Sequence, residues 1–218
     1  MKILVLSCDN YSDLFEPFHY CIEKYWIDHP EIIYSTETII NPYYKTICKN
    51  YPIEKWSKRI HDTVEEIDDD IILMMCDDCF IQSNVNTDRL NEIISQISGD
   101  VASYDLNEPI GLTYEKYSDN TYIKTGEYKT SVALSIWQKD KLLKCFDCEY
   151  SPWNFELANT HNNFTFLING GVLPIDFGRK LWKDGAWGIV RGKWSINAKK
   201  FFDKENFSID YSKRGFYV

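Results

Sequence analysis

Short apolar runs alternate with helix-patterned segments over the first half of the chain. Four runs have the length and continuous apolar character of strands buried on both faces: Ile3–Leu6, Ile32–Ser35, Ile71–Met75 and Val101–Tyr104. Between them, apolar residues recur at helical spacing from Leu14 to Trp26, from Trp56 to Ile67 and from Leu90 to Ile97. This alternation predicts an α/β fold with a mainly parallel central sheet and helices on both of its faces.

The pattern changes from about Gly111. Polar and aromatic residues alternate from Tyr114 to Tyr128 around a turn at residues 118–120, which is typical of an antiparallel hairpin. Further elements are expected as strands at Val132–Trp137 and Phe164–Ile168, and as helices near Asp140 and at Trp153–Asn159, the latter opened by Pro152. Residues 41–52 are rich in turn formers and are interpreted as a loop. With 218 residues and no linker, we expect one domain, with a smaller antiparallel portion in its C-terminal half.

The net charge of −9 argues against a general nucleic-acid binder, which needs a basic surface. The charge is uneven, because residues 179–218 carry ten Lys and Arg against four Asp and Glu. This basic C-terminal segment is a candidate for peripheral contact with an anionic membrane face or for a pyrophosphate, and a solvated tail is the alternative. No signal-peptide core and no run of about 20 apolar residues is visible, so a cytoplasmic location is expected.

Seven cysteines, an odd number, favour free thiols over a disulfide framework. Cys76 and Cys79, and again Cys145 and Cys148, have CxxC spacing, which raises the alternative of a zinc site. The long separation between the two pairs and the lack of glycine-rich turns around them argue against zinc.

The acidic pair Asp77-Asp78 is the strongest candidate site. It directly follows the apolar run Ile71–Met75, and ligands of open α/β sheets bind beyond the carboxyl ends of the strands. Adjacent carboxylates there suit Mg²⁺ or Mn²⁺, and two solvated turn residues are the alternative. The acidic run Asp68–Asp70 precedes the strand and is therefore interpreted as a solvated loop at the opposite end of the sheet.

Five segments, in this order and spacing, resemble small GT-A-type glycosyltransferases of bacterial surface-polysaccharide clusters and of large DNA viruses. They are Lys2–Tyr11, Trp56–Arg59, Asp77–Ile81, Pro152–Glu156 and Arg191–Trp194. The resemblance covers about residues 1–195. It implies a GT-A-like, Rossmann-like fold and a nucleotide-diphosphate-sugar donor based on UDP, dTDP or GDP. It also implies a glycan or lipid-linked glycan as acceptor, in polysaccharide or glycan synthesis.

In this resemblance residues 1–110 would bind the nucleotide sugar, residues 111–195 would hold the acceptor and catalytic groups, and residues 196–218 form the basic C-terminal segment. Asp77 and Asp78 correspond to the metal-binding DxD-type motif, although here the two acids are adjacent and followed by a cysteine. Glu156 is the candidate general base of an inverting, Mn²⁺- or Mg²⁺-assisted transfer, with Trp153 beside it for an acceptor sugar; an exposed helical Glu is the alternative.

The remaining candidates would contact the donor. Asp9 would accept a hydrogen bond from the base or ribose, or instead cap a helix, and Tyr11 would stack. Arg59 would offset pyrophosphate charge, or lie on the surface. Arg191 and Lys193 would close over the diphosphate, or belong to a solvated tail. His161 is a further candidate metal or phosphate ligand.

Two other functions fit part of the pattern. A sugar nucleotidyltransferase shares the fold and acidic site, but it needs a glycine-rich loop after the first strand, and residues 7–11 contain no glycine. A non-catalytic carbohydrate-binding module would explain the aromatic residues and has no need of Asp77, Asp78 or Glu156. The absence of any GxGxxG motif disfavours a dinucleotide-dependent dehydrogenase.

Overall fold

A nine-stranded mixed sheet, in the order β3-β2-β1-β4-β8-β5-β9-β7-β6, organises the protein. The structure is a computed structural model that describes residues 1–109, 113–147, 149–157, 163–178 and 188–217. The strands of the sheet are β1 Lys2–Leu6, β2 Ile32–Thr36, β3 Lys45–Cys48, β4 Ile71–Cys76, β5 Val101–Asp105, β6 Tyr114–Ser118, β7 Thr121–Lys124, β8 Ser135–Gln138 and β9 Thr165–Asn169. A separate two-stranded hairpin pairs β10, Ile189–Val190, with β11, Lys193–Trp194.

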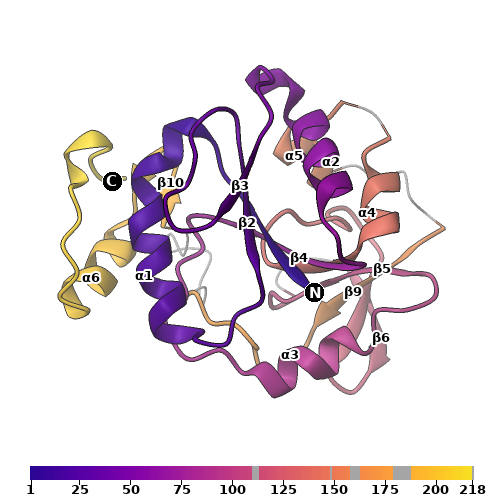
Figure 1. The fold of residues 1–218 in the computed structure, drawn as a ribbon. Helices are drawn as coiled ribbons and strands as arrows, with labels where there is room; N and C mark the ends of the chain where they lie inside the picture. Colours follow the sequence, from indigo (N-terminus) through magenta and orange to yellow (C-terminus); the bar gives the residue numbers. More distant parts are fainter. Residues whose placement is uncertain (110–112, 148, 158–162, 179–187, 218) are drawn as a thin grey trace.

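Helices cover both faces of the sheet, as Figure 1 shows with α1 and α6 on one side and α2, α4 and α5 on the other. The helices are α1 Phe15–Tyr25, α2 Trp56–Glu66, α3 Thr87–Ile94, α4 Lys139–Cys145, α5 Pro152–Leu157 and α6 Ile196–Lys204. Short 3₁₀ turns lie at Asp9–Leu14, Ile53–Lys55 and Tyr211–Lys213 and are labelled η1, η2 and η4. The mixed α/β architecture predicted from the sequence is confirmed.

The alternating side chains of β4 explain why its sequence is continuously apolar. Leu73 and Met75 pack into the core that α1, α3 and α6 cover, whereas Ile72 and Met74 pack into the core that α2, α4 and α5 cover. All four side chains are fully buried. Complete burial of such a side chain contributes roughly 1.5–3 kcal/mol, so this one strand anchors both layers of helices.

The parallel part of the sheet comprises β1 to β4, and β5 with β9. β8 runs antiparallel between β4 and β5, and the β6–β7 hairpin adds antiparallel strands beyond β9. The predicted antiparallel portion in the C-terminal half is therefore confirmed. The carboxyl ends of β1, β2, β4, β5 and β9 share one edge of the sheet, which is where ligands bind in such folds.

The interpretation of residues 41–52 as a loop is wrong at Lys45–Cys48, which form the edge strand β3. Ile47 is the one buried residue of that strand, so its sequence lacks the apolar run by which buried strands are recognised. The strand expected at Val132–Trp137 begins only at Ser135, because Leu134 has a positive φ of 53°. The last element expected as a helix, Trp153–Asn159, is described only to Leu157.

At the opposite edge, Asp69 lies 2.8 Å from the terminal amino group of Met1, at the amino ends of β1 and β4. The acidic run Asp68–Asp70 therefore lies away from the candidate site, as the sequence predicts. Among the described residues, no helix combines the length and the apolar character that crossing a bilayer would require.

Candidate functional site

Asp77 and Asp78 follow β4 directly and line a pocket of about 720 Å³ at the carboxyl edge of the sheet. Other lining residues come from the loop after β1, from α2, from the segment before β8, from α5 and from the β10–β11 turn: among them Ser7, Tyr11, Arg59, Val132, Trp153, Glu156, Arg191 and Gly192. The predicted position of the acidic pair, at the end of a buried central strand and open to a cleft, is confirmed.

The two carboxyl groups differ in their surroundings. Asp77 is 2% exposed, and its Oδ2 accepts a 2.5 Å hydrogen bond from the Ser7 hydroxyl. Burial, with the neighbouring charge of Asp78, raises the pKa of Asp77 well above its usual value. Burial also raises the pKa of Asp78 to about 6, although a hydrogen bond from the Ile189 backbone opposes this. The pKa values of both acids are raised in spite of the nearby charge of Arg214, and a divalent cation would relieve this unfavourable arrangement.

Arg59 is buried rather than on the surface, since its side chain is only 4% exposed. It donates a 2.8 Å hydrogen bond to the carbonyl of Ser7 and lies 3.2 Å from a carboxylate oxygen of Glu37. It also lies 3.3 Å from the hydroxyl of Ser35. The guanidinium group therefore joins the ends of β1 and β2 and forms part of the pocket wall.

Asp9 does not line the pocket. Its carboxylate accepts hydrogen bonds from the backbone of Thr38 and Ile39 at 2.9 and 3.0 Å, and from the Thr38 hydroxyl at 2.5 Å. These bonds lower the pKa of Asp9 in spite of its partial burial. Asp9 does not occupy the capping position of the η1 turn either, because the N-cap residue is Cys8. Its visible role is to hold the loop after β2.

Tyr11 does line the pocket, and the guanidinium group of Arg214 covers its ring at 4.3 Å from the centroid. Burial raises the pKa of the Tyr11 hydroxyl to about 12, with a further contribution from the charge of Asp78. The phenol is therefore neutral at physiological pH, and its ring forms part of the wall beside the acidic pair.

Glu156 and Trp153, both on α5, also line the pocket. Oε1 of Glu156 accepts a 3.1 Å hydrogen bond from the backbone N–H of Val132. Trp153 is 73% exposed at the rim of the pocket. The structure thus places the predicted base and its aromatic neighbour in the same pocket as Asp77 and Asp78.

The β10–β11 turn brings Arg191 into the pocket lining but leaves Lys193 outside it. Arg191 and Gly192 have positive φ angles of 51° and 79°, as the two-residue turns of tight hairpins require. The backbone N–H of Gly188, just before β10, donates a 3.0 Å hydrogen bond to the carbonyl of Asp78. The predicted cationic segment is thereby attached directly to the acidic pair.

Arg214 is the residue near the site that sequence reasoning missed. Its side chain is 7% exposed and pairs with Asp13 through two hydrogen bonds, of 2.7 Å from Nε and 2.6 Å from Nη2. Its charge lowers the pKa values of Asp77 and Asp78, against the larger effect of burial. In the sequence, only the excess of positive charge from residue 179 onward pointed to this region, and that excess does not distinguish Arg214 from the other basic residues.

Among the described cysteines of the two CxxC pairs, Cys79 packs in the core under α1 and α6, and Cys145 packs in the core on the other face of the sheet. Cys76 lines the pocket, and Cys148 lies outside the described residues. His161, the further candidate ligand, also lies outside the described residues.

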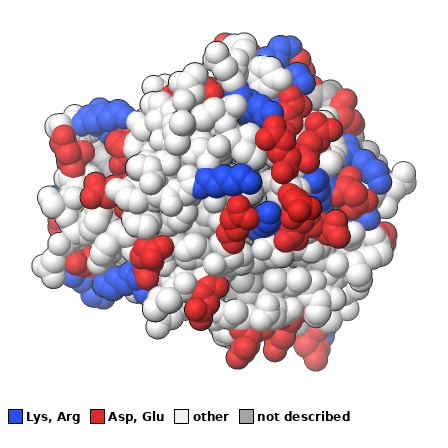
Figure 2. All heavy atoms as spheres, in the orientation of Figure 1, with Lys and Arg blue, Asp and Glu red and all other residues white. Residues whose placement is uncertain are grey.

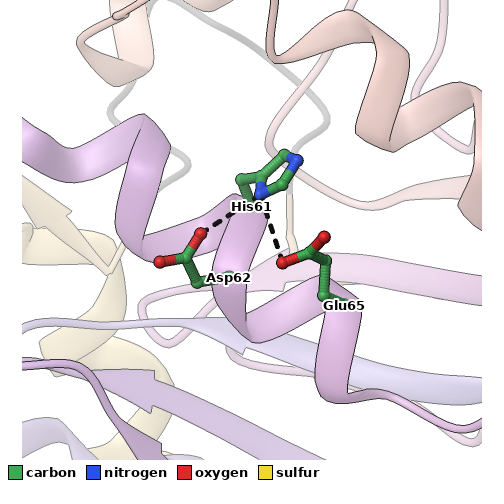
Figure 3. A group of neighbouring side chains, drawn as sticks. All are labelled: His61, Asp62 and Glu65. Carbon is green, nitrogen blue, oxygen red and sulfur yellow. Dashed lines mark hydrogen bonds and ion pairs between the residues drawn. The ribbon is translucent and has the colours of Figure 1, made fainter.

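A second group of metal-ligand types, His61, Asp62 and Glu65, lies on α2 (Figure 3). Asp62 already accepts hydrogen bonds from Tyr51 and Lys58, at 2.8 and 3.0 Å. The group is partly exposed, and its mutual contacts are those of neighbouring residues on one helix. On the face shown in Figure 2, acidic side chains gather on the side of α2 with Lys and Arg among them. We therefore interpret the group as part of a charged helix surface.

The sequence matches no protein-family model and no curated protein. Solved structures with a similar arrangement include a galactosyltransferase, LgtC, in complex with donor and acceptor sugar analogues (TM-score 0.42, 12% identity, 66% of this chain and 60% of that one). S. aureus TarS is also similar, with a TM-score of 0.49 and 11% identity, and the match covers 77% of this chain and 34% of that one. A nucleotidyl transferase from Methanothermobacter thermautotrophicus is similar as well, with a TM-score of 0.47 and 12% identity, and the match covers 78% of this chain and 85% of that one. This chain thus spans less than two thirds of the length of the first two.

Proposed function

We propose that the protein is a glycosyltransferase that moves a sugar from a nucleotide-diphosphate sugar to an acceptor hydroxyl with inversion. The donor would carry UDP, dTDP or GDP, and the acceptor would be a glycan or a lipid-linked glycan. One observation carries the proposal. Asp77 and Asp78 lie at the carboxyl end of β4 in the same large pocket as Glu156 and Trp153, so donor-type and acceptor-type groups face one cavity.

A divalent cation, Mn²⁺ or Mg²⁺, fits the acidic pair. Both carboxyl groups have raised pKa values, which shows that their surroundings favour neutralisation of the negative charge. Carboxylate oxygens are the usual protein ligands of these ions, which also bind substrate phosphates. When bound, the ion would offset the charge that builds up on the leaving diphosphate. Asp78 is the better ligand, because it is partly exposed to the pocket whereas Asp77 is buried against Ser7.

The nucleotide would lie along the wall that Ser7, Tyr11 and Arg59 form at the ends of β1 and α2. Arg191, on the β10–β11 turn, also lines the pocket and would contact the diphosphate. Asp9 and Lys193 do not line the pocket, so we assign them no contact with the donor. In this proposal residues 1–110 supply most of the donor site and residues 111–195 most of the acceptor site.

Glu156 would act as the general base. An inverting displacement needs a group on the acceptor side that takes the hydroxyl proton while the nucleotide leaves from the other face of the sugar. The bond to Val132 N–H orients the Glu156 carboxylate on its wall of the pocket. The exposed ring of Trp153 offers an apolar face on which an acceptor sugar can stack.

Peripheral contact with an anionic membrane face completes the proposal for a lipid-linked acceptor. Lys213 and Arg214 pair with Asp13 within the protein, so they do not serve this contact. Exposed lysines of the C-terminal segment and the adjoining hairpin are the candidates: Lys193, Lys200 and Lys204.

A thermal-shift and calorimetry screen of UDP-, dTDP- and GDP-sugars, with and without Mn²⁺, tests the proposal. A donor present at 100 times its Kd adds ~2.7 kcal/mol to the free energy of unfolding. We expect one nucleotide series to stabilise the protein only with the metal, and slow hydrolysis of that sugar to release the nucleoside diphosphate. Stabilisation by a nucleoside triphosphate, with pyrophosphate released when a sugar phosphate is added, would instead identify a nucleotidyltransferase. Binding of free glycans alone would identify a carbohydrate-binding module.

A further inference from the structure

Arg214 connects two pocket walls that come from opposite ends of the chain. On one side it bonds the Asp13 carboxylate twice and donates a 2.5 Å hydrogen bond from Nη2 to the carbonyl of Asn10. On the other side its Nη1 lies 3.4 Å from the carbonyl of Gly192. The residues it reaches therefore belong to the η1 turn and to the β10–β11 turn.

Both connected walls belong to the candidate donor site. Tyr11 of the η1 turn and Gly192 of the β10–β11 turn line the pocket, and the Arg214 guanidinium lies 4.3 Å from the Tyr11 ring centroid. The acidic pair lines the same pocket, and the charge of Arg214 acts on both of its carboxyl groups. A single nearly buried cation thus contacts each wall beside Asp77 and Asp78.

Backbone hydrogen bonds hold the segment that carries Arg214 in place. Trp194 of β11 donates to the carbonyl of Gly215 at 3.0 Å and accepts from Tyr217 at 2.9 Å. The hairpin is in turn attached to the acidic pair, through the 3.0 Å bond from Gly188 to Asp78. The Trp194 ring is fully buried and stacks on Phe80. The described C-terminal segment is therefore attached to the hairpin beside the pocket rather than free in solution.

We propose that Arg214 is a positioning residue of the donor site, which it keeps in binding shape by joining the η1 turn to the β10–β11 turn. This inference rests on the proposed function for its ligand. A bidentate arginine–carboxylate pair is both directional and strong when it is shielded from water. Losing this pair leaves Tyr11 and Gly192 in the chain but removes the contacts that fix the distance between the two turns. Arg214 need not touch the donor to affect its affinity.

Arg214→Gln and Asp13→Asn test this inference from both partners. We expect each to raise the donor Kd and KM about 10- to 100-fold, the usual effect of losing a group that orients binding residues, with a smaller change in kcat. The double variant is expected to lose less donor affinity than the sum of the two single variants, because both remove the Arg214–Asp13 pair, although Asp13→Asn also removes the ion pair of Lys213. Lys144→Gln is the matched control, since Lys144 pairs with Asp140 on α4 and does not line the pocket.

Arg214→Lys separates position from charge. A lysine keeps the positive charge but cannot form the two-oxygen bond to Asp13 and reach both carbonyls at once. We expect Arg214→Lys to recover less than half of the donor-binding free energy that Arg214→Gln loses. A donor Kd equal to wild type in Arg214→Lys would show that charge alone matters and would overturn the positioning role.

Amide hydrogen exchange without ligand tests the connection independently of the donor. In Arg214→Gln and Asp13→Asn we expect faster exchange at residues 9–14 and 189–194, and unchanged exchange in α3. Lys144→Gln should match wild type. Unchanged exchange at both turns, or an unchanged donor Kd, would overturn the inference. If wild type binds none of the nucleotide sugars while exchange rises at both turns, the connection stands and the proposed function fails.

Discussion

The Ser7 hydroxyl donates a 2.5 Å hydrogen bond to Oδ2 of Asp77, and the two residues lie directly after the paired parallel strands β1 and β4. The bond joins the ends of two central strands and uses one oxygen of the more buried acid. Asp78 remains as the carboxylate that is partly exposed to the pocket. This difference between neighbouring acids leads to the first two predictions.

Asp78→Asn is expected to abolish Mn²⁺-dependent donor binding and to leave the fold intact. The amide keeps the volume of the carboxyl group but removes the charge that binds a cation. Thermal unfolding with and without Mn²⁺ and donor measures the effect. Asp119→Asn is the control, because that side chain is 96% exposed in the β6–β7 hairpin. A calorimetric Kd for the donor that matches wild type would exclude Asp78 as a ligand.

In metal-free protein, the contribution of Asp78 to stability is expected to fall as the pH rises from about 4 to about 6. The folded-state pKa of Asp78 is raised from 3.8 to about 6, so in this range the folded state holds a proton that the unfolded state has released. The free energy of unfolding then falls with increasing pH. Urea unfolding in EDTA across this range, compared between wild type and Asp78→Asn, isolates the contribution. Parallel curves for the two proteins would contradict the prediction.

Glu156→Gln is expected to lower kcat by ~10²–10⁴-fold with little change in donor binding. The glutamine can still accept the bond from Val132 N–H through its amide oxygen, but it cannot take a proton. Steady-state kinetics with a fixed acceptor measure the loss, and the acidic limb of the pH profile is expected to disappear. Glu156→Ala, which also removes the bond to Val132, controls for position. A glutamine variant with more than half of wild-type kcat would remove Glu156 from the mechanism.

Arg59→Leu is expected to destabilise the protein by about 3 kcal/mol, the lower end of the usual cost of breaking a buried ion pair. The loss leaves the carbonyl of Ser7 and the largely buried carboxylate of Glu37 without this partner. Chemical denaturation measures the change. Lys58→Gln, at the neighbouring exposed position of α2, serves as the control. Equal stability of the two variants would show that the contacts of Arg59 contribute little.

The described cysteines are expected to be reduced and free of zinc. Cys79 and Cys145, one from each CxxC pair, lie in cores on opposite faces of the sheet, so these two thiols cannot bind the same ion. Elemental analysis of protein purified without added metal, together with thiol titration under denaturing conditions, checks this. Stoichiometric zinc in that preparation would contradict it.

Much of the site was predictable because local chemistry decides it. A continuous apolar run such as Ile71–Met75 indicates a central strand buried on both faces, and the acids that follow such a strand emerge at the carboxyl edge of the sheet. Pro152 at the first turn of α5 likewise indicated the helix that carries Glu156. Asp9 shows the limit of this reasoning, since a polar residue after the first strand fits a ligand contact and a loop contact equally well.

The sequence by itself determined the α/β alternation, the central strand and the acidic pair at its end, because burial periodicity and strand direction depend on neighbouring residues. Only the tertiary structure decided that Arg59 lies buried between β1 and β2, and that Arg214 covers Tyr11 from the far end of the chain. It also decided that Lys45–Cys48 form an edge strand. These features depend on contacts between residues distant in sequence, and a lone arginine or a strand with one buried residue carries no periodic signal that would reveal its partner.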